Sequence, residues 1–226
     1  MRQAAERVAW EDGSERFPSN LAVTWWECLV SPDRFFRRVS WEGPFSRPLL
    51  YFLIVAVLAG LLGLFWFAWS PWGAVEHFGL TLELQLLSFF LTPFALLLSL
   101  GLVSLAQHLF VVLMAPQRRG LGATATVLCY ASGVGLVKAF VPPALGFAGF
   151  ASGVFQVSYL VFYVTLFAAV LAWYVMVQVA GLRQAHSITT GRAAAIVLLP
   201  MAIGLVLTVV LAMVVIALGM LADLPI

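Results

Sequence analysis

The stretch PLLYFLIVAVLAGLLGLFWFAW, residues 48–69, decides the fold of this chain because it contains no charged side chain over its whole length. A helix needs ~20 consecutive apolar residues to cross a hydrocarbon core of ~30 Å. The charge of the sequence changes sharply at this point, since 14 of the 22 charged side chains lie before Leu49 and only 8 follow. Residues 48–69 therefore predict a membrane-spanning helix, and the uncharged sequence beyond them predicts more.

The composition as a whole is typical of an integral membrane protein. The chain has 226 residues, of which 63% are hydrophobic and 10% charged, whereas a soluble domain averages ~25% charged residues. Its net charge of +2 is small and its basic residues form no stripe, so no nucleic-acid partner is indicated. We predict an all-α integral membrane bundle of five transmembrane helices with short N-terminal interfacial helices. The predicted spans are residues 48–69, 86–113, 124–141, 154–182 and 193–221.

The sequence before the first span divides into two parts. Residues 1–18 are polar, carry both signs of charge and show no apolar period, so we expect a disordered cytoplasmic tail. Residues 19–47 are interpreted as an interfacial amphipathic segment of short helices. Aromatic residues such as Phe35 and Phe36 are interspersed there with arginines that can reach lipid headgroups. Residues 48–226 form the predicted five-span domain.

The distribution of basic residues predicts the orientation in the membrane. An excess of lysine and arginine in short loops marks the cytoplasmic side. Seven arginines precede the first span, two follow the second and two follow the fourth, whereas Lys138 alone lies on the opposite side. This pattern puts the N-terminus in the cytoplasm and the C-terminus outside. Because the chain has almost no extramembrane domain, we expect it in the bacterial inner (plasma) membrane.

The sequence contains no recognisable catalytic, cofactor or metal motif. It has no nucleophile elbow, zinc-protease or Walker sequence, and Cys28 and Cys129 lack metal-ligand spacing. Cys28 lies on the predicted cytoplasmic side and Cys129 near the cytoplasmic end of a span, so we expect both thiols to be reduced. Polar groups inside the spans require a reason, because an unpaired polar group in lipid costs several kcal/mol. Lys138 can extend to the headgroups. His108 either bonds to a neighbouring helix or belongs to a functional site.

Six residues are expected to converge on one cytoplasmic pocket. The loops between spans two and three and between spans four and five lie on the same predicted side, and His108 lies ~9 Å inside it at 1.5 Å per residue. Histidines, a phenol and arginines suit an anionic headgroup or an acidic partner segment. In the competing interpretation, His108 bonds Tyr130 or a backbone carbonyl, and the arginines only fix topology. The predicted pocket consists of His108, Arg118, Arg119, Tyr130, His186 and Arg192.

Three stretches of the chain carry a resemblance to a known family. They are SPDRFFRRV at 31–39, QHLFVVLMAPQRRGLGATATVLCYASG at 107–133 and GLRQAHSITTGRAAAIVLLP at 181–200. In order and spacing they resemble the Yip domain family, five-span membrane proteins with eukaryotic Ypt/Rab-interacting members and a bacterial branch. The resemblance implies a five-helix bundle with a cytoplasmic N-terminus and an external C-terminus, and it implies little about activity. Gly133 departs from the family, which usually has proline at that position.

The favoured function is that of a non-enzymatic membrane-organising or scaffold factor with a cytoplasmic docking face. Its expected partners are the lipid bilayer, anionic lipid headgroups and an unidentified protein. The alternative is a lipid-handling protein or small transporter that uses a polar path between spans two and three, near His108, Tyr130 and Lys138. An intramembrane enzyme is a third class. The spans carry no acidic residue, which disfavours ion transport. A continuous water-accessible groove between spans two and three would favour the alternative.

The orientation can be tested with reporter fusions. A reporter that is active only outside the cytoplasm is expected to be active when fused after Ile226 and inactive when fused at Met1, because eleven of the twelve basic residues lie on one predicted side. Equal activity of the two fusions would contradict a five-span topology.

Overall fold

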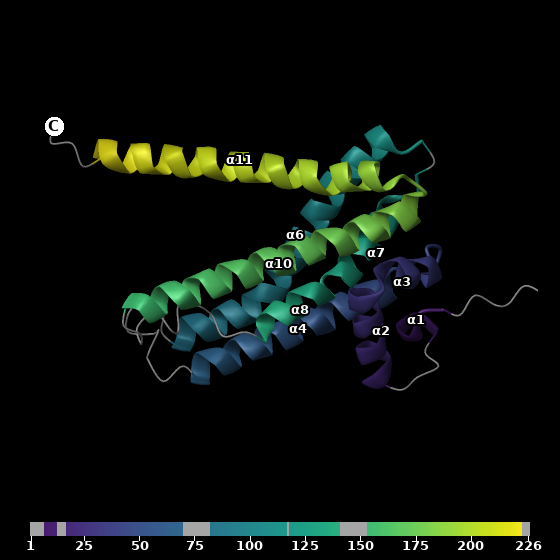
Figure 1. Ribbon diagram of the computed structural model, residues 1–226, viewed down its shortest axis with the longest axis horizontal. Coiled ribbons are helices and arrows are strands. Elements are labelled where there is room, and N and C mark those ends of the chain that lie inside the picture. Colours follow the sequence, from purple (N-terminus) through teal and green to yellow (C-terminus); the bar gives the residue numbers. More distant parts are fainter. Residues whose placement is uncertain (1–6, 13–16, 70–81, 117, 141–152, 223–226) are drawn as a thin grey trace, which may run out of the picture.

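The computed structural model describes residues 7–12, 17–69, 82–116, 118–140 and 153–222 of the chain. Throughout these residues the regular secondary structure is helical and no strand occurs. Five helical segments are long and apolar enough to cross a membrane, which confirms the predicted all-α bundle of five transmembrane helices. The long helices run mainly along the long axis of the molecule (Figure 1).

The third of the five spans differs from the others because it is broken into two helices. The two helices meet at Ser132, whose hydroxyl donates to the carbonyl of Cys129 at 2.6 Å. The other four spans are single helices. In chain order the spans are α4 (Ser46–Trp69), α6 (Leu82–Met114), α7 (Leu121–Ala131) with α8 (Gly133–Ala139), α10 (Gly153–His186) and α11 (Thr190–Ala222).

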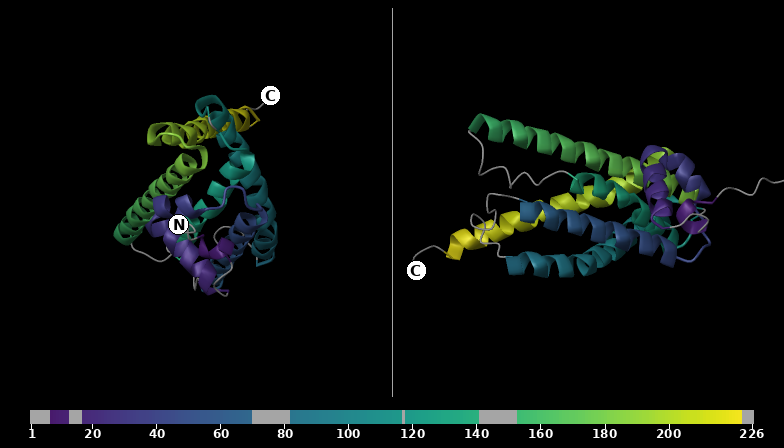
Figure 2. Two further views of the ribbon diagram at one scale, coloured as in Figure 1. Left: turned by 90° about the vertical axis from the view of Figure 1, so that its right-hand side faces the viewer. Right: turned by 90° about the horizontal axis from the view of Figure 1, so that it is seen from below.

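Three short helices and two loops gather at one end of the bundle, called here the arginine-rich end (Figures 1 and 2). The loops join α6 to α7 and α10 to α11. An ion pair between Asp33 and Arg183, with 2.6 Å between Oδ1 and Nη2, fastens a short helix to the end of α10. The short helices are α1 (Ala9–Asp12), α2 (Ser19–Val30) and α3 (Pro32–Arg38).

The segment before α2 is more ordered than its sequence suggests. The disorder expected for residues 1–18 is not found in residues 9–12, which form α1, and Val8 and Trp10 are buried. The Trp10 indole N–H donates to the carbonyl of Arg47 at 2.8 Å, and Nη1 of Arg47 donates to the carbonyl of Trp10 at 3.1 Å. A buried aromatic ring whose polar atom is also satisfied anchors this segment to the bundle.

The aromatic side chains of α3 pack into the protein. Phe35 and Phe36 have no exposed surface, and the Phe35 ring lies 5.1 Å from the Tyr130 ring on α7. Arg34 and Arg37 of the same helix are exposed. This helix therefore has an apolar face directed toward the bundle and an exposed basic face. Contact of its arginines with lipid headgroups stays a prediction.

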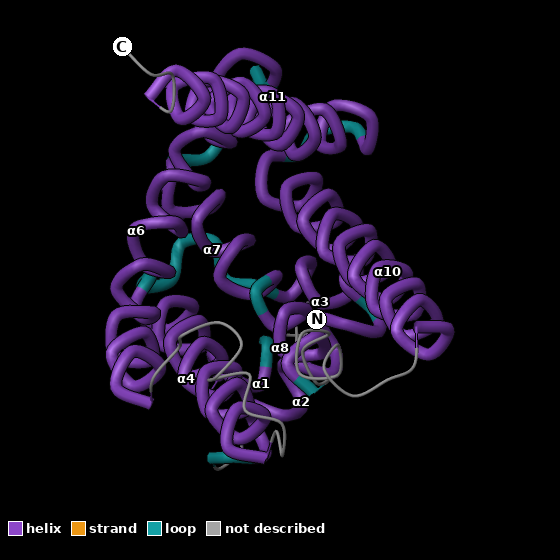
Figure 3. Tube along the Cα trace, turned by 90° about the vertical axis from the view of Figure 1, so that its left-hand side faces the viewer, coloured by secondary structure: helices purple, strands orange, loops and turns teal. Residues whose placement is uncertain are grey.

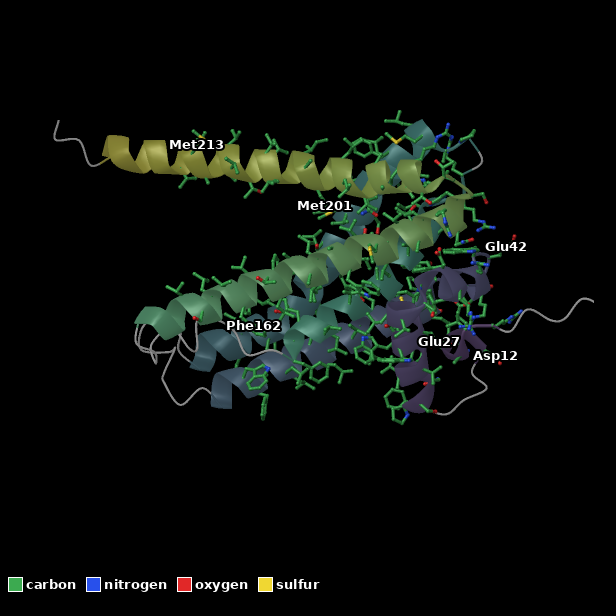
Figure 4. All side chains as sticks on the ribbon, viewed as in Figure 1. Asp12, Glu27, Glu42, Phe162, Met201 and Met213 are labelled. Carbon is green, nitrogen blue, oxygen red and sulfur yellow. The ribbon has the colours of Figure 1, made fainter. Side chains whose placement is uncertain are left out.

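The third span is the centre of the bundle. An 18-residue window of α7 and α8 is 67% buried, whereas the corresponding windows of the other spans are at most 22% buried. Viewed along the bundle, α7 lies between α6 and α10 (Figure 3). Phe162, Met201 and Met213 project from the outer helices, while Asp12, Glu27 and Glu42 lie at the arginine-rich end (Figure 4). A span shielded from lipid can carry small and polar residues, which explains why its mean hydropathy of 1.3 is the lowest of the five.

Gly181 allows α10 to approach both α7 and α3. A Cβ atom at this position would lie 2.5 Å from Cγ1 of Val127 and 2.9 Å from the ring of Phe36. Gly101 on α6 offers a contrast, because a Cβ atom there would meet no atom within 4 Å. Alanine substitution at Gly101 changes only the intrinsic helix propensity, whereas at Gly181 it also disturbs a close helix contact. Comparing the two variants therefore isolates the effect of the contact.

We expect Gly181→Ala to lower the free energy of unfolding by ~1–3 kcal/mol, because the added methyl group overpacks the contact among α3, α7 and α10. Gly101→Ala should be neutral or stabilising by up to ~1 kcal/mol. Thermal unfolding in detergent can be followed by the reaction of the buried thiols of Cys28 and Cys129 with a fluorescent reagent. Equal unfolding midpoints for the two variants would contradict the packing described for Gly181.

Candidate functional site

Three side chains from three spans form a continuous hydrogen-bonded chain at the arginine-rich end. The backbone N–H of Arg119 donates to Nδ1 of His186 at 3.2 Å. Nε2 of His186 lies 3.0 Å from the hydroxyl oxygen of Thr124, which lies 3.0 Å from Nδ1 of His108. This arrangement, called here the His–Thr–His chain, joins α6, α7 and α10. His186 and Thr124 are buried, and His108 is half-buried.

The backbone donor fixes the tautomer of His186, and a single direction of donation then satisfies the rest of the chain. Because a backbone N–H can only donate, Nδ1 of His186 carries no proton, and neutral His186 has its proton on Nε2. That N–H donates to the Thr124 hydroxyl, whose own O–H is then directed at Nδ1 of His108. All three donors point the same way along the chain. Both histidines are neutral in this arrangement, and the remaining proton of His108 lies on Nε2.

The turn after α10 positions His186. Ser187 has a φ of 53°, in the left-handed region, and the N–H of Ile188 donates to the carbonyl of Arg183 at 3.3 Å. A left-handed residue followed by a bond back across the last turn is the Schellman arrangement that ends many helices. It stops α10 at His186 and leaves the imidazole directed at α7.

Arg119 connects the site to its surroundings in two further ways. Its Nη1 donates to the carbonyl of Ala185 at 3.0 Å, so the cation lies at the C-terminal end of α10, where the helix dipole favours positive charge. Its guanidinium carbon also lies 5.6 Å from the centre of the Trp41 ring, within range of a cation–π contact. The loop between α6 and α7 is therefore held against the end of α10 and against the segment between α3 and α4.

A second polar contact lies next to the His–Thr–His chain in sequence. Nε2 of Gln107 donates to Oε1 of Gln178 at 2.6 Å, which links α6 to α10. Both glutamines are buried, and they satisfy part of each other's hydrogen-bonding capacity in a region without bulk water. Sequence reasoning missed Thr124 and Gln178. The position of Gln178 within an apolar span is the one signal that could have indicated a polar partner on another helix.

The predicted six-residue pocket is only partly assembled. His108, His186 and Arg119 lie together, and Arg118 adjoins them as an exposed residue. Arg192 is exposed at the start of α11, where its backbone N–H donates to the hydroxyl of Thr189 at 3.5 Å. Binding of an anion by these residues stays a prediction.

Tyr130 does not lie with the other residues of the predicted pocket. Its O–H donates to Oε1 of Glu11 at 2.8 Å and not to His108, whose Nδ1 lies 3.0 Å from the Thr124 hydroxyl oxygen. The reason is geometric, because six residues at ~100° each turn Tyr130 roughly 120° around the helix from Thr124. Glu11 also accepts the backbone N–H of Ser40 at 2.8 Å, and partial burial raises the pKa of its carboxyl group.

The two thiols are buried and separate from this site. Both cysteines are free, and burial raises the pKa of Cys28, which makes its reactive thiolate form unfavourable. Within the described ranges no three potential metal ligands come together. The chemistry on offer at the arginine-rich end is therefore hydrogen bonding and positive charge.

We expect Thr124→Val to lower the free energy of unfolding by ~1–3 kcal/mol, because it leaves the buried Nε2–H of His186 without an acceptor. Thr124→Ser keeps the hydroxyl and serves as the matched control. Thermal unfolding in detergent measures the difference. If the valine and serine variants unfold at the same temperature, the hydroxyl does not hold the two histidines together.

A comparison with protein-family models matches the Yip1 domain over residues 26–211. No curated protein matches the chain, and neither does any solved structure. The matched range covers most of the chain and includes all of the His–Thr–His chain, whereas α1 lies outside it. A match of this extent agrees with the five-span bundle described above and with the resemblance of the three sequence stretches. This chain belongs to the Yip1 domain family of integral membrane proteins.

Proposed function

We propose that this protein is a non-enzymatic, membrane-organising scaffold whose arginine-rich end is a cytoplasmic docking face. The observation that supports the proposal is the His–Thr–His chain, which ties the loop between α6 and α7 to the end of α10. Because both the backbone and the side chain of Arg119 are bonded to the end of α10, the residues next to it in this loop are held in a fixed arrangement. Such preorganisation reduces the entropy that a docking surface loses when a partner binds.

The charge of this end supports an acidic partner. The half-buried arginines Arg38 and Arg183 are paired with Glu27 and Asp33. Among the residues that the structure describes, no carboxylate lies at ion-pair distance from the exposed arginines of this end. Guanidinium groups bind carboxylates and phosphates through two parallel hydrogen bonds. The exposed arginines are Arg7, Arg34, Arg37, Arg47, Arg118, Arg119 and Arg192, of which Arg7 and Arg47 lie near Glu11.

We infer that the partner is an acidic protein segment, and that anionic lipid headgroups at the same surface are the competing source of negative charge. An arginine near an anionic surface contributes ~1 kcal/mol. Four exposed arginines other than Arg119 can be replaced together by uncharged residues, because none of their side chains belongs to the His–Thr–His chain. Arg119 is left unchanged because its backbone and side chain hold α10.

The alternative, a lipid-handling protein or small transporter with a polar path between α6 and α7–α8, has less support. The cavity between these helices and α10 is lined mainly by apolar side chains. His108, Tyr130 and Lys138 are not among its lining residues. A path for ions or polar solutes needs groups that replace water along its length, and the described cavity offers few of them.

We expect substitution of four exposed arginines by glutamine to weaken binding of a fluorescent Asp/Glu-rich peptide at least tenfold, because each lost charge removes ~1 kcal/mol of attraction. The full chain is held in nanodiscs of zwitterionic lipid, and anisotropy is measured against salt concentration. The substituted residues are Arg34, Arg37, Arg118 and Arg192.

The matched control replaces the same four arginines by lysine, which keeps the charge, and it should retain salt-sensitive binding. Equal peptide affinity of the glutamine variant and the unaltered protein would overturn the docking face. No peptide binding in zwitterionic nanodiscs, combined with association of the unaltered protein alone with anionic vesicles, would assign the face to lipid headgroups.

A further inference from the structure

A groove runs along the central span, away from the His–Thr–His chain. It has a volume of about 290 Å³ and lies between α6 and α10, with α7 and α8 as its floor and Phe52 of α4 at its side. Its lining residues fall in residues 96–103 of α6, 128–135 of α7–α8 and 167–174 of α10. Each range covers seven residue steps, or ~10 Å of helix at 1.5 Å per residue. The three helices thus form an elongated trough along the bundle axis.

The trough is apolar and open to the hydrocarbon of the membrane. Among the described residues that line it, the polar ones are Ser99, Ser132 and Tyr174, and the Ser132 hydroxyl already donates to a backbone carbonyl. Wall residues on both sides are partly exposed, with Val103 at 39% and Phe167 at 45%. All three walls belong to membrane spans, so the medium that meets this opening is lipid chains.

The floor of the trough is a glycine that leaves space unfilled. Gly135 is exposed although Val134 and Leu136 beside it are buried, and a Cβ atom at Gly135 would meet no atom within 4 Å. The central span is therefore accessible from the membrane at this position. Because the recess is apolar and opens to the membrane, a lipid chain can enter it.

The volume distinguishes among possible occupants. An apolar cavity of ~150 Å³ accommodates one benzene molecule, so about 290 Å³ corresponds to roughly a dozen carbon atoms. One turn of a helix with a diameter of ~10–12 Å and a pitch of 5.4 Å fills roughly 400–600 Å³. A helix of a partner or of a second copy therefore does not fit inside the trough, whereas a single alkyl chain does.

A cation lies at one end of the trough. Nζ of Lys138, three residues after Gly135, lies 4.7 Å from the centre of the Phe167 ring, and Phe167 lines the trough. Within the described part of the chain, no carboxylate is at ion-pair distance from Lys138. Lys138 is at the end of the third span opposite the arginine-rich end, where a lysine side chain can reach phosphate groups.

We propose that the trough binds one acyl chain of a membrane phospholipid whose phosphate lies at Lys138. The alkyl chain fills the recess above Gly135 and Ser132, and the ammonium group pairs with the phosphodiester. This site is independent of the docking face, because the two share no residue. A free fatty acid offers the same alkyl chain, with a carboxylate in place of the phosphate.

The proposal can be tested by photo-cross-linking the full chain in nanodiscs with a phospholipid that carries a diazirine in the middle of one acyl chain. Peptide mass spectrometry then locates the adducts. We expect adducts on residues 128–135 of the central span. Gly135→Leu should reduce them at least fivefold, because the added side chain occupies the space of the lipid chain. Adducts on Leu205 and Val206, which are exposed on α11, serve as the internal reference.

Gly101→Leu is the matched control, since Gly101 is also a helical glycine with open space around it and does not line the trough. It should label like the unaltered protein. Ser99→Phe fills the trough from α6 and replaces Gly135→Leu if that variant does not fold. Equal labelling of residues 128–135 with and without the filled trough would overturn the acyl-chain site, as would absence of labelling there in the unaltered protein.

Lys138→Gln and Lys138→Arg test the headgroup. Glutamine should lower labelling of residues 128–135 when the photoactive phospholipid is a minor component, and arginine should preserve it, because only the charge is needed. A diazirine fatty acid is compared under the same conditions. If the fatty acid labels these residues as strongly as the phospholipid, or if Lys138→Gln changes nothing, the phosphate assignment is overturned.

Discussion

Polar groups in a bilayer have no water to bind, so each must find its partner inside the protein. The bundle places its most polar span at the centre, where polar groups of neighbouring spans can reach it. Thr124 lies on α7 between two histidines of neighbouring spans, and Gln107 of α6 donates to Gln178 of α10. Because these contacts link α6, α7 and α10 near the arginine-rich end, they also set where the loops of that end lie. The position of Arg118 and Arg119 at that end therefore depends on the pairing of polar groups within the spans.

The number of spans could be predicted from the sequence because it depends on local composition. An uncharged run of ~20 residues identifies a span without knowledge of its neighbours. The same local argument fails for Trp10 and Glu11, which lie in a polar segment and acquire partners 37 and 119 residues away. One strongly buried ring fixes α1 to the bundle, and a single aromatic residue gives no periodic signal.

The candidate site was predictable in part because the number of spans fixes which loops lie on the same side. The loops between spans had to meet at one side, so the approach of His108, His186 and Arg119 followed from topology. Tyr130 was assigned by its depth in the membrane alone, although its place around the helix axis decides its neighbours. Thr124 has no charge and no unusual spacing, and its role depends on contacts from two other spans. Rotation about a helix axis becomes predictable only when the neighbours of that helix are known.

The two surfaces of the protein use the central span in different ways. At one end α7 supplies a hydroxyl that organises loops, and toward the other end α8 supplies a glycine that leaves a recess open to lipid. The break at Ser132 separates these two halves. The outer helices are the ones that contact lipid along most of their length. The central span instead differs between its two ends, with the Thr124 hydroxyl at one and Gly135 toward the other.

The proton order of the His–Thr–His chain has a consequence for how its sequence can vary. Its direction originates at the backbone N–H of Arg119, a group that nineteen of the twenty amino acids also possess. Substitution of that side chain leaves the donor in place, and only proline removes it. The polarity of the chain is therefore insulated from most single-codon changes at position 119. The side chain of Arg119 has a separate role, since it donates to the carbonyl of Ala185 and lies over the Trp41 ring.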